Sequence, residues 1–126
     1  MFLKFVTVTQ FDLFSSYPND NCNDSTPIDP QTLLPTTYLN HQSTQGNVQI
    51  YLNTSQTAQS VQKPLLMFET NTASCGGFSG LSDSFAATLW AIDYGLNLAS
   101  ANFSAALFHV GGVSDYYNVR PSSPFI

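Results

Sequence analysis

Charged residues are scarce in this chain of 126 residues, and positive ones are the scarcest. Three Lys and Arg residues stand against eight Asp and Glu residues, so the formal net charge is −5. Nucleic-acid binding requires a cluster of basic side chains that neutralises phosphates, and three are too few. Apolar stretches near the ~20 residues that cross a bilayer are also lacking, because Asn, Gln, Ser and Thr interrupt each hydrophobic run. We therefore expect neither a nucleic acid nor a membrane as a partner.

The beginning of the chain lacks the long apolar core of a secretion signal. Residues 1–6 carry one positive charge and several apolar side chains, but Thr7, Gln10 and Asp12 interrupt them. We expect no signal peptide in this stretch. Hydrophobic residues make up 43% and aromatic residues 13% of the chain, which is typical of folded protein, and the length allows one domain at most.

Uncharged polar side chains replace the missing charges, a pattern that suits a secreted or extracellular protein. Three Asn-x-Ser/Thr sequons place potential glycans at Asn23, Asn53 and Asn102, although such triplets also arise by chance in Asn-rich sequence. The two cysteines, Cys22 and Cys75, each lie in a turn-like stretch where a secreted protein would place a disulfide. Two unrelated free thiols are the alternative.

Apolar runs and turn-forming stretches divide the chain into four segments. Residues 1–18 predict a strand and its exit, and residues 19–62 predict a loop followed by one or two short helices that end near Gln62. Residues 63–112 have the pattern of a βαβ unit. Residues 113–126 are rich in Tyr, Pro and Ser and predict a connector.

The βαβ unit is expected at about residues 64–110. A continuous apolar run at 65–68 predicts a strand buried on both faces, and a second run at 105–110 predicts the next strand. A glycine-containing loop and a helix separate the two runs. Two strands joined in this way lie parallel in one sheet, so the fold class is α/β.

The helix of this unit is the clearest element in the sequence. Ser82 or Asp83 can cap its start, and we interpret Trp90 and Tyr94 as packing residues. Its apolar positions are spaced by four, three, four and three, so that they trace one helical stripe. The stripe consists of Phe85, Leu89, Ile92, Leu96 and Ala99.

Glu69 is the only glutamate of the chain and stands where the first strand of the unit ends. Parallel α/β folds place catalytic and ligand-binding groups at this end of their strands. The following loop adds Asn71 and the backbone amides of Gly76 and Gly77, which a polar ligand could approach closely because glycine has no side chain. His109 stands at the matching end of the next strand, so these groups converge if the two strands are neighbours.

Both residues also have a purely structural interpretation. Glu69 could simply mark the solvated end of its strand, and His109 could be a hydrogen-bonded structural histidine. Motifs for phosphate, zinc or a serine nucleophile are missing, since the chain has no P-loop, CxxC, HExxH or G-x-S-x-G sequence. Asp20, Asp24 and Asp29 do not follow the spacing of a calcium loop and are better explained by a solvated loop. We expect no metal and no cofactor.

Four stretches carry a resemblance: YPNDNC at 17–22, FETNTASCGGFSGLSDSF at 68–85, LWAIDYG at 89–95 and HVGG at 109–112. Together they look like the fungal branch of glycoside hydrolase family 79, which includes β-glucuronidases and heparanase-like enzymes. The resemblance extends over residues 17–120 and is strongest at 64–112. Its centre is an acidic residue at the end of a strand.

The resemblance implies a (β/α)8 TIM barrel followed by a β-sandwich, and retaining hydrolysis of β-linked uronic acid sugars. Glu69 would be the nucleophile at the end of the seventh strand, and residues 105–110 would be the eighth strand. Tyr17 and the amides around Gly76 and Gly77 would hold the carboxylate of the sugar. The implied partner is therefore a carbohydrate that contains a uronide.

The chain is too short for the whole barrel. An eight-stranded barrel needs about 250 residues, roughly twice this length. The general acid should be a glutamate on the fourth strand, and the chain has no second glutamate. We therefore expect an incomplete (β/α)8 barrel, a single partial domain of residues 1–126 that is inactive alone and whose partner is the missing part of the barrel. The alternative is a non-catalytic carbohydrate-binding or interaction module on the same scaffold.

Overall fold

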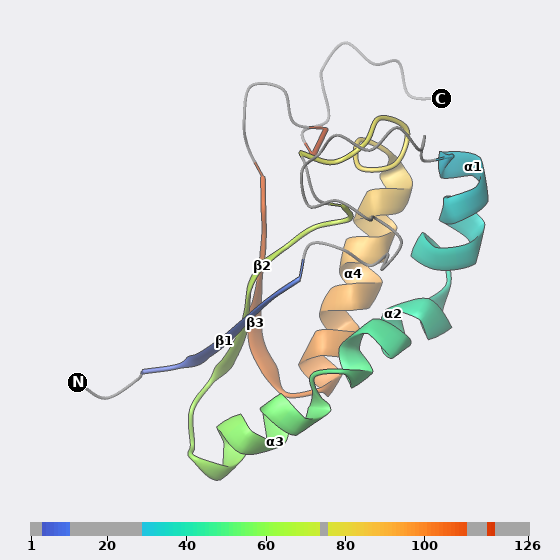
Figure 1. Cartoon of the computed structure of the whole chain (residues 1–126). Coiled ribbons are helices and arrows are strands. Elements are labelled where there is room, and N and C mark those ends of the chain that lie inside the picture. Colours follow the sequence, from blue (N-terminus) through green and yellow to red (C-terminus); the bar gives the residue numbers. More distant parts are fainter. Residues whose placement is uncertain (1–3, 11–28, 74–75, 111–115, 118–126) are drawn as a thin grey trace.

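The computed structural model describes residues 4–10, 29–73, 76–110 and 116–117, and the structural statements below concern these residues. The fold is a small mixed α/β arrangement of a parallel sheet and helices (Figure 1). In chain order its elements are β1 (Val6–Gln10), α1 (Pro30–Leu33), the π-helical turn η1 (Leu34–Tyr38), α2 (His41–Gln49), α3 (Leu52–Ser60), β2 (Leu65–Thr70), α4 (Phe85–Ser100) and β3 (Phe103–Phe108).

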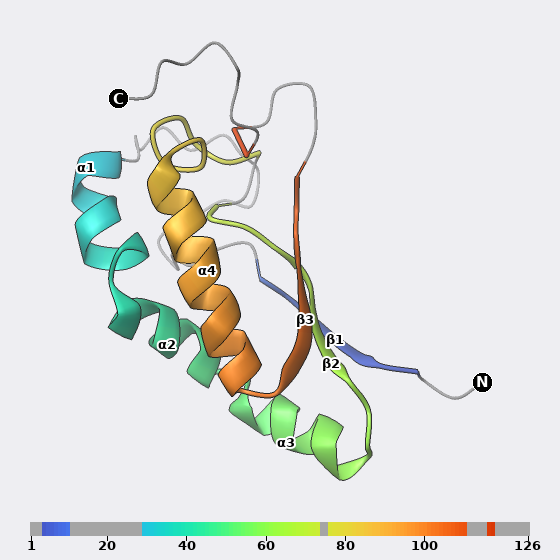
Figure 2. The same ribbon diagram turned by 180° about the vertical axis from the view of Figure 1, so that it is seen from behind.

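The three strands form one parallel sheet in the order β1-β2-β3, so neighbours in the sheet are also neighbours in the chain. The expected βαβ unit is confirmed as β2, α4 and β3. All helices lie on the same side of the sheet, and the opposite side carries no described element (Figures 1 and 2). Within the described part of the chain, helices therefore cover one face of the sheet only.

The core lies between the sheet and α4, which packs against β3, α2 and η1. Trp90 and Tyr94 are completely buried there, and their rings stack with centroids 5.0 Å apart, which confirms them as packing residues. The edge of Tyr38 meets Trp90 with ring centroids 6.0 Å apart. Such aromatic contacts join η1 and α4 into one layer.

Local signals explain where the helices begin and end. The side chains of Asp29 and Asn40 accept hydrogen bonds from the amides of Gln31 and Gln42, which caps α1 and α2. Residues 30–60 are consequently more helical than the one or two short helices that we expected. Gln62 has a positive φ of 53° just after α3, so the prediction of a helix end near this residue is confirmed.

The N-cap of helix α4 lies one residue after Asp83 and two after Ser82, the two residues predicted to cap it. Its N-cap is Ser84, whereas Asp83 accepts a hydrogen bond from the amide of Gly80 at 2.6 Å within the preceding loop. Ser82 is buried and also belongs to that loop. Asn102 has a positive φ of 62° and directly follows Ala101, the C-cap of the helix.

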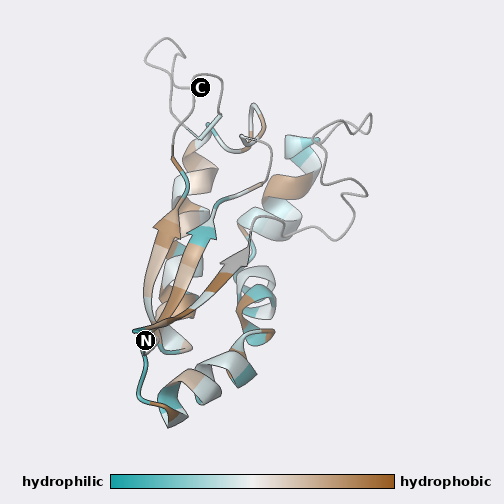
Figure 3. Cartoon of the chain, turned by 60° about the vertical axis from the view of Figure 1, so that its left-hand side comes forward, coloured by the Kyte–Doolittle hydropathy of each residue, from teal (hydrophilic) through white to brown (hydrophobic). Residues whose placement is uncertain are grey.

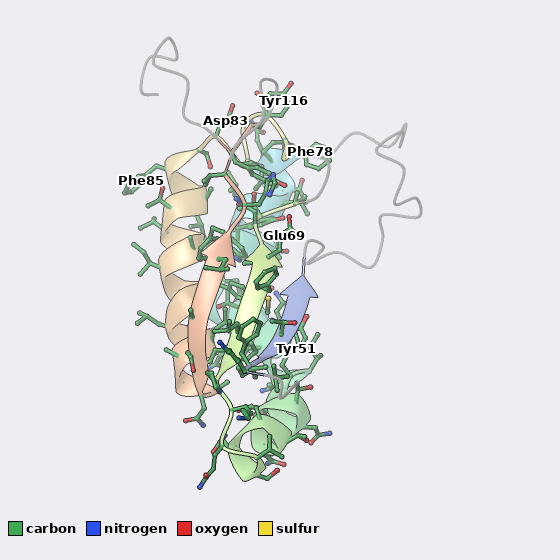
Figure 4. The ribbon with its side chains drawn as sticks, turned by 90° about the vertical axis from the view of Figure 1, so that its left-hand side faces the viewer. Tyr51, Glu69, Phe78, Asp83, Phe85 and Tyr116 are labelled. Atoms are coloured by element: carbon green, nitrogen blue, oxygen red, sulfur yellow. The ribbon has the colours of Figure 1, made fainter. Side chains whose placement is uncertain are left out.

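The apolar stripe of α4 points away from the core, although such a stripe normally faces it. Phe85 is 74% exposed and Leu96 is 65% exposed, and Leu89 and Ile92 are exposed as well. Figure 4 shows Phe85 projecting from the helix away from the rest of the molecule. Trp90, Tyr94 and Leu98 form the buried face instead. Helix α4 therefore has an apolar surface on two sides.

Strand β2 is buried on one face only, so the prediction of burial on both faces is wrong for the described residues. Leu65 and Met67 point into the core, whereas Phe68 is 49% exposed. We call the side of the sheet opposite the helices the open face; it carries Leu66, Phe68 and Leu107. Figure 3 turns this side forward and shows strands coloured mostly as hydrophobic.

A polar cluster connects α2 to α4 on the helical side. His41 Nδ1 lies 2.7 Å from Asp93 Oδ1, and the hydroxyl of Thr44 donates to Asp93 Oδ2. Asn97 Nδ2 donates to Thr44 Oγ1 at 3.2 Å. Both oxygens of Asp93 are therefore engaged in holding the helices together.

No helix of the described ranges has the length and apolarity needed to cross a bilayer.

Candidate active site

The candidate site lies at the carboxyl ends of β2 and β3. Glu69 is the last residue but one of β2, and His109 directly follows β3. His109 Nδ1 lies 3.1 Å from Glu69 Oε1, and each side chain is 43% exposed. Figure 4 looks onto the sheet and shows Glu69 at the end of β2, beside the end of β3. The structure thus brings together the two residues that the sequence placed at matching strand ends.

A β-bulge determines which way Glu69 points. Met67 pairs with Val8 and Ala106, and Thr70 pairs with Gln10 and Phe108. Between these two pairs, β2 advances by three residues and each neighbouring strand advances by two. The extra residue reverses the alternation of side chains, so that Thr70 is buried under the helices and Glu69 is left partly exposed.

An open depression of about 420 Å³ adjoins the two residues. Its lining combines the polar pair with apolar side chains, namely Phe68, Glu69, Leu107, Phe108, His109 and Val110. A carboxylate beside an apolar surface suits a sugar ring, which presents both hydroxyl groups and C–H bonds. The depression is open because none of the described helices or strands covers this face of the sheet.

Asn71 connects the two strand ends through hydrogen bonds of its side-chain amide. Its Nδ2 donates to the carbonyl oxygen of His109 at 2.6 Å, and its Oδ1 accepts from the amide of Thr72 at 2.7 Å. The amide of His109 in turn donates to the carbonyl oxygen of Thr70 at 2.8 Å. Asn71 is thus committed to hydrogen bonds within the chain.

The loop after β2 needs glycine at the positions that we singled out. Gly76 and Gly77 have φ values of 80° and 82°, which side chains of L-residues rarely adopt. A Cβ on Gly77 would lie 2.6 Å from the hydroxyl of Ser82. Ser82 itself organises the loop, since its hydroxyl accepts from the amide of Phe78 at 3.0 Å and pairs with the hydroxyl of Thr72 at 2.7 Å.

Two tyrosines in the expected connector also reach this site, which sequence reasoning missed. The ring of Tyr117 meets that of His109 at a centroid distance of 5.7 Å, and its hydroxyl donates to the carbonyl oxygen of Ala73. The amide of Tyr116 donates to the carbonyl oxygen of Gly76 at 2.6 Å. Their position soon after the end of a parallel strand was the available signal.

Several of the predicted residues cannot be compared with the site or lie apart from it. Tyr17, Cys22, Asn23 and Cys75 are outside the described residues, as is the Gly-Gly pair after His109. The other two sequon asparagines are exposed: Asn53 lies on α3, and Asn102 lies before β3, at the opposite end of that strand from the site.

Positive charge is sparse around the site. Lys4 and Lys63 precede β1 and β2 and so lie at the amino ends of these strands. Among the described residues, His109 is therefore the one basic side chain at the carboxyl ends of the strands. The described part of the chain contains no group of three or more His, Cys, Asp or Glu residues that could hold a metal ion.

Two fungal proteins are similar to this chain. A beta-glucuronidase from Neurospora crassa is 32% identical over 95 residues, which cover 73% of this chain and 17% of that protein. A beta-glucuronidase from Aspergillus niger is 32% identical over 96 residues, which cover 73% of this chain and 18% of that protein. The chain thus spans less than a fifth of these curated relatives. No family model matches it.

Proposed function

We propose that this chain is part of a retaining glycoside hydrolase of family 79 that acts on β-linked glucuronides, with Glu69 as its nucleophile. One observation carries the proposal: the only glutamate of the chain lies near the carboxyl end of the central parallel strand beside a histidine, in a chain similar to two fungal beta-glucuronidases. The substrate class comes from the names of these relatives. The partner of the site is accordingly a carbohydrate.

The architecture supports a segment of a TIM barrel. Doubly wound sheets carry helices on both faces, whereas a barrel keeps its helices outside and its strands in sequential order. Here the strand order is sequential and the helices cover one face. The open face, with Leu66, Phe68 and Leu107, would be the barrel interior. The exposed stripe of α4 would pack against a neighbouring helix in the remainder of the barrel.

The position of Glu69 fits the chemistry of a retaining enzyme. A carboxylate oxygen attacks the anomeric carbon while a second carboxyl group, about 5 Å away, gives its proton to the departing oxygen. Water then attacks the glycosyl-enzyme ester, and the second group removes the proton from that water. The chain contains no other glutamate. The acid must therefore come from another part of the complete barrel, and the isolated chain should be inactive.

Other residues have supporting roles in this proposal. Tyr17 and the amides of Gly76 and Gly77 would hold the carboxylate of the sugar, and Asn71 would fix the strand ends through its hydrogen bond to His109. We further propose that the complete protein is secreted and carries glycans. The exposure of Asn53 and Asn102 is compatible with such a modification.

A hybrid enzyme tests this function. Residues of this chain replace the matching segment of the Neurospora relative, and hydrolysis of an aryl β-glucuronide is measured. We expect activity that falls about 10³-fold or more in Glu69→Gln, because the nucleophile acts as a unit with the acid. A 2-deoxy-2-fluoro-glucuronyl fluoride should leave a covalent adduct on Glu69, detected by mass spectrometry of peptides.

The control for this experiment is His41→Gln, a substitution on the helical side of the sheet, where His41 contacts Asp93. Activity should be unchanged in this variant. A hybrid that folds and keeps its activity in Glu69→Gln would contradict the proposal. If the isolated chain instead bound glucuronate equally well with and without Glu69→Gln, the non-catalytic module would explain the chain better.

A further inference from the structure

We infer that His109 is a positioning residue for Glu69: it holds one carboxylate oxygen and leaves the other directed at the substrate. The catalytic meaning of this pair rests on the function proposed above. The geometry of the pair does not depend on that function, because it follows from contacts between described residues.

The backbone of His109 is fixed on both sides of its α-carbon. Its amide donates to the carbonyl oxygen of Thr70 at 2.8 Å, and its carbonyl oxygen accepts from Asn71 Nδ2 at 2.6 Å. Both partners follow Glu69 directly in the chain. The ring is further restricted by edge contact with Tyr117. His109 is therefore held in place relative to β2 before its side chain meets the carboxylate.

The side-chain contact engages one oxygen of Glu69. His109 Nδ1 lies 3.1 Å from Oε1, and Oε2 has no hydrogen-bond partner among the described residues. The pair between His41 and Asp93 is different, because Thr44 donates to the second oxygen of Asp93. The carboxylate on the helical side is thus saturated, whereas Glu69 keeps one oxygen available at the depression.

Stability does not explain the pair. Both side chains are 43% exposed, and exposed ion pairs typically contribute about 0–1 kcal/mol because water and salt screen them. A free glutamate side chain samples many rotamers, which weakens it as a nucleophile that must meet one carbon atom. A fixed imidazole N–H on Oε1 reduces that freedom. The bulge in β2 has the same effect, since it directs Glu69 away from the helical core.

The composition of the chain makes it possible to observe the carboxyl group of Glu69 directly by NMR. Glu69 is the only glutamate, so labelling the full chain with [5-¹³C]glutamate gives one side-chain carboxyl signal that needs no assignment. We expect the chemical shift of this signal to differ in His109→Ala, because the imidazole N–H from which Oε1 accepts is removed. The matched control His41→Ala should leave the signal as in the wild type. A ¹⁵N spectrum of histidine should show a proton on Nδ1 of His109.

Two results would overturn the inference: a carboxyl signal that is the same in His109→Ala and in the wild type, or a ¹⁵N spectrum in which Nδ1 of His109 carries no proton. The ¹⁵N spectrum decides the question even if His109→Ala does not fold. In the hybrid enzyme, His109→Ala should lower kcat about 10-fold to 100-fold with little change in KM, and His109→Gln should recover part of it. An unchanged kcat beside an inactive Glu69→Gln would reject positioning and leave the proposed function standing, whereas an active Glu69→Gln would reject the proposed function itself.

Discussion

The geometry of Gly77 makes it a sensitive single position in the loop after β2. Its φ of 82° is unfavourable for other residues, and an added Cβ would lie 2.6 Å from Ser82 Oγ. We expect Gly77→Ala to lower the free energy of unfolding by about 2 kcal/mol or more, because backbone strain adds to the clash. Denaturant unfolding followed by circular dichroism measures this change.

Gly46 provides the matched control for that substitution. It lies exposed within α2, and nothing would come within 4 Å of an added Cβ. Gly46→Ala should stabilise the chain by about 0.5–1 kcal/mol, because alanine favours the helix. If both variants had the same stability, the described conformation of the Gly77 loop would be wrong.

Tyr94 links the stability of the chain to alkaline pH. Burial raises the pKa of its phenol, the neighbouring Tyr51 raises it further, and a hydrogen bond with Thr70 acts in the opposite direction. Because the folded state holds the proton more tightly than the unfolded state, stability is intact below pH ~10 and falls as the pH rises, by up to about 1.4 kcal/mol per unit.

The measurement is denaturant unfolding at pH 9 and pH 11. Tyr94→Phe should reduce the difference in unfolding free energy between the two, since the titrating hydroxyl is gone. Tyr116→Phe, a change of a 40% exposed side chain, should leave that difference as in the wild type. An equal loss in the wild type and Tyr94→Phe would exclude Tyr94 as its source.

At the scale of elements, the sequence predicted strands and helix in the right order but not which faces they bury. The apolar run 65–68 indicated burial on both sides, because periodicity reports hydrophobicity and not what lies opposite. In the described chain only Leu65 and Met67 contact the core, and Phe68 is exposed. The bulge that turns Glu69 outward had no signal in the sequence, since it depends on pairing with both neighbouring strands.

Helix α4 shows the same limit of pattern-based prediction. Apolar residues occupy two faces of this helix, and both sets have helical spacing. One set is the exposed stripe, with Phe85, Leu89, Ile92 and Leu96, and the other is the buried face, with Trp90, Tyr94 and Leu98. Spacing alone cannot rank two such faces. The aromatic pair decided which one meets the sheet, since Trp90 and Tyr94 bury the largest side chains of the helix.

The two faces of α4 should respond differently to the same substitution. Leu98 is 1% exposed, and Leu98→Gln should cost about 3 kcal/mol or more because it buries an amide in place of packed methyl groups. Leu96→Gln, two residues earlier in the same helix, should change the unfolding free energy by less than about 0.5 kcal/mol. Thermal or denaturant unfolding of both variants measures the contrast, and equal costs would indicate that the stripe is covered in the isolated chain.

At the scale of the whole molecule, the described sheet is apolar on a side that no helix covers. Its outer strands, β1 and β3, each have one edge that pairs with no other described strand. Free parallel edges and an apolar face promote association between chains. We therefore expect the isolated chain to associate with rising concentration and to bind a hydrophobic dye, as sedimentation velocity and fluorescence would show.

A substitution on each surface separates the contributions to this association. Leu107→Lys places a charge on the open face, and Ile92→Lys places one on the stripe of α4; each should weaken association because both surfaces are exposed. Thr57→Lys, on the exposed side of α3, is the matched control and should have a smaller effect. A wild-type chain that remains monomeric at about 100 µM and binds no dye would mean that its apolar surfaces do not require the rest of a barrel to cover them. That outcome would favour a self-contained carbohydrate-binding module over a barrel segment.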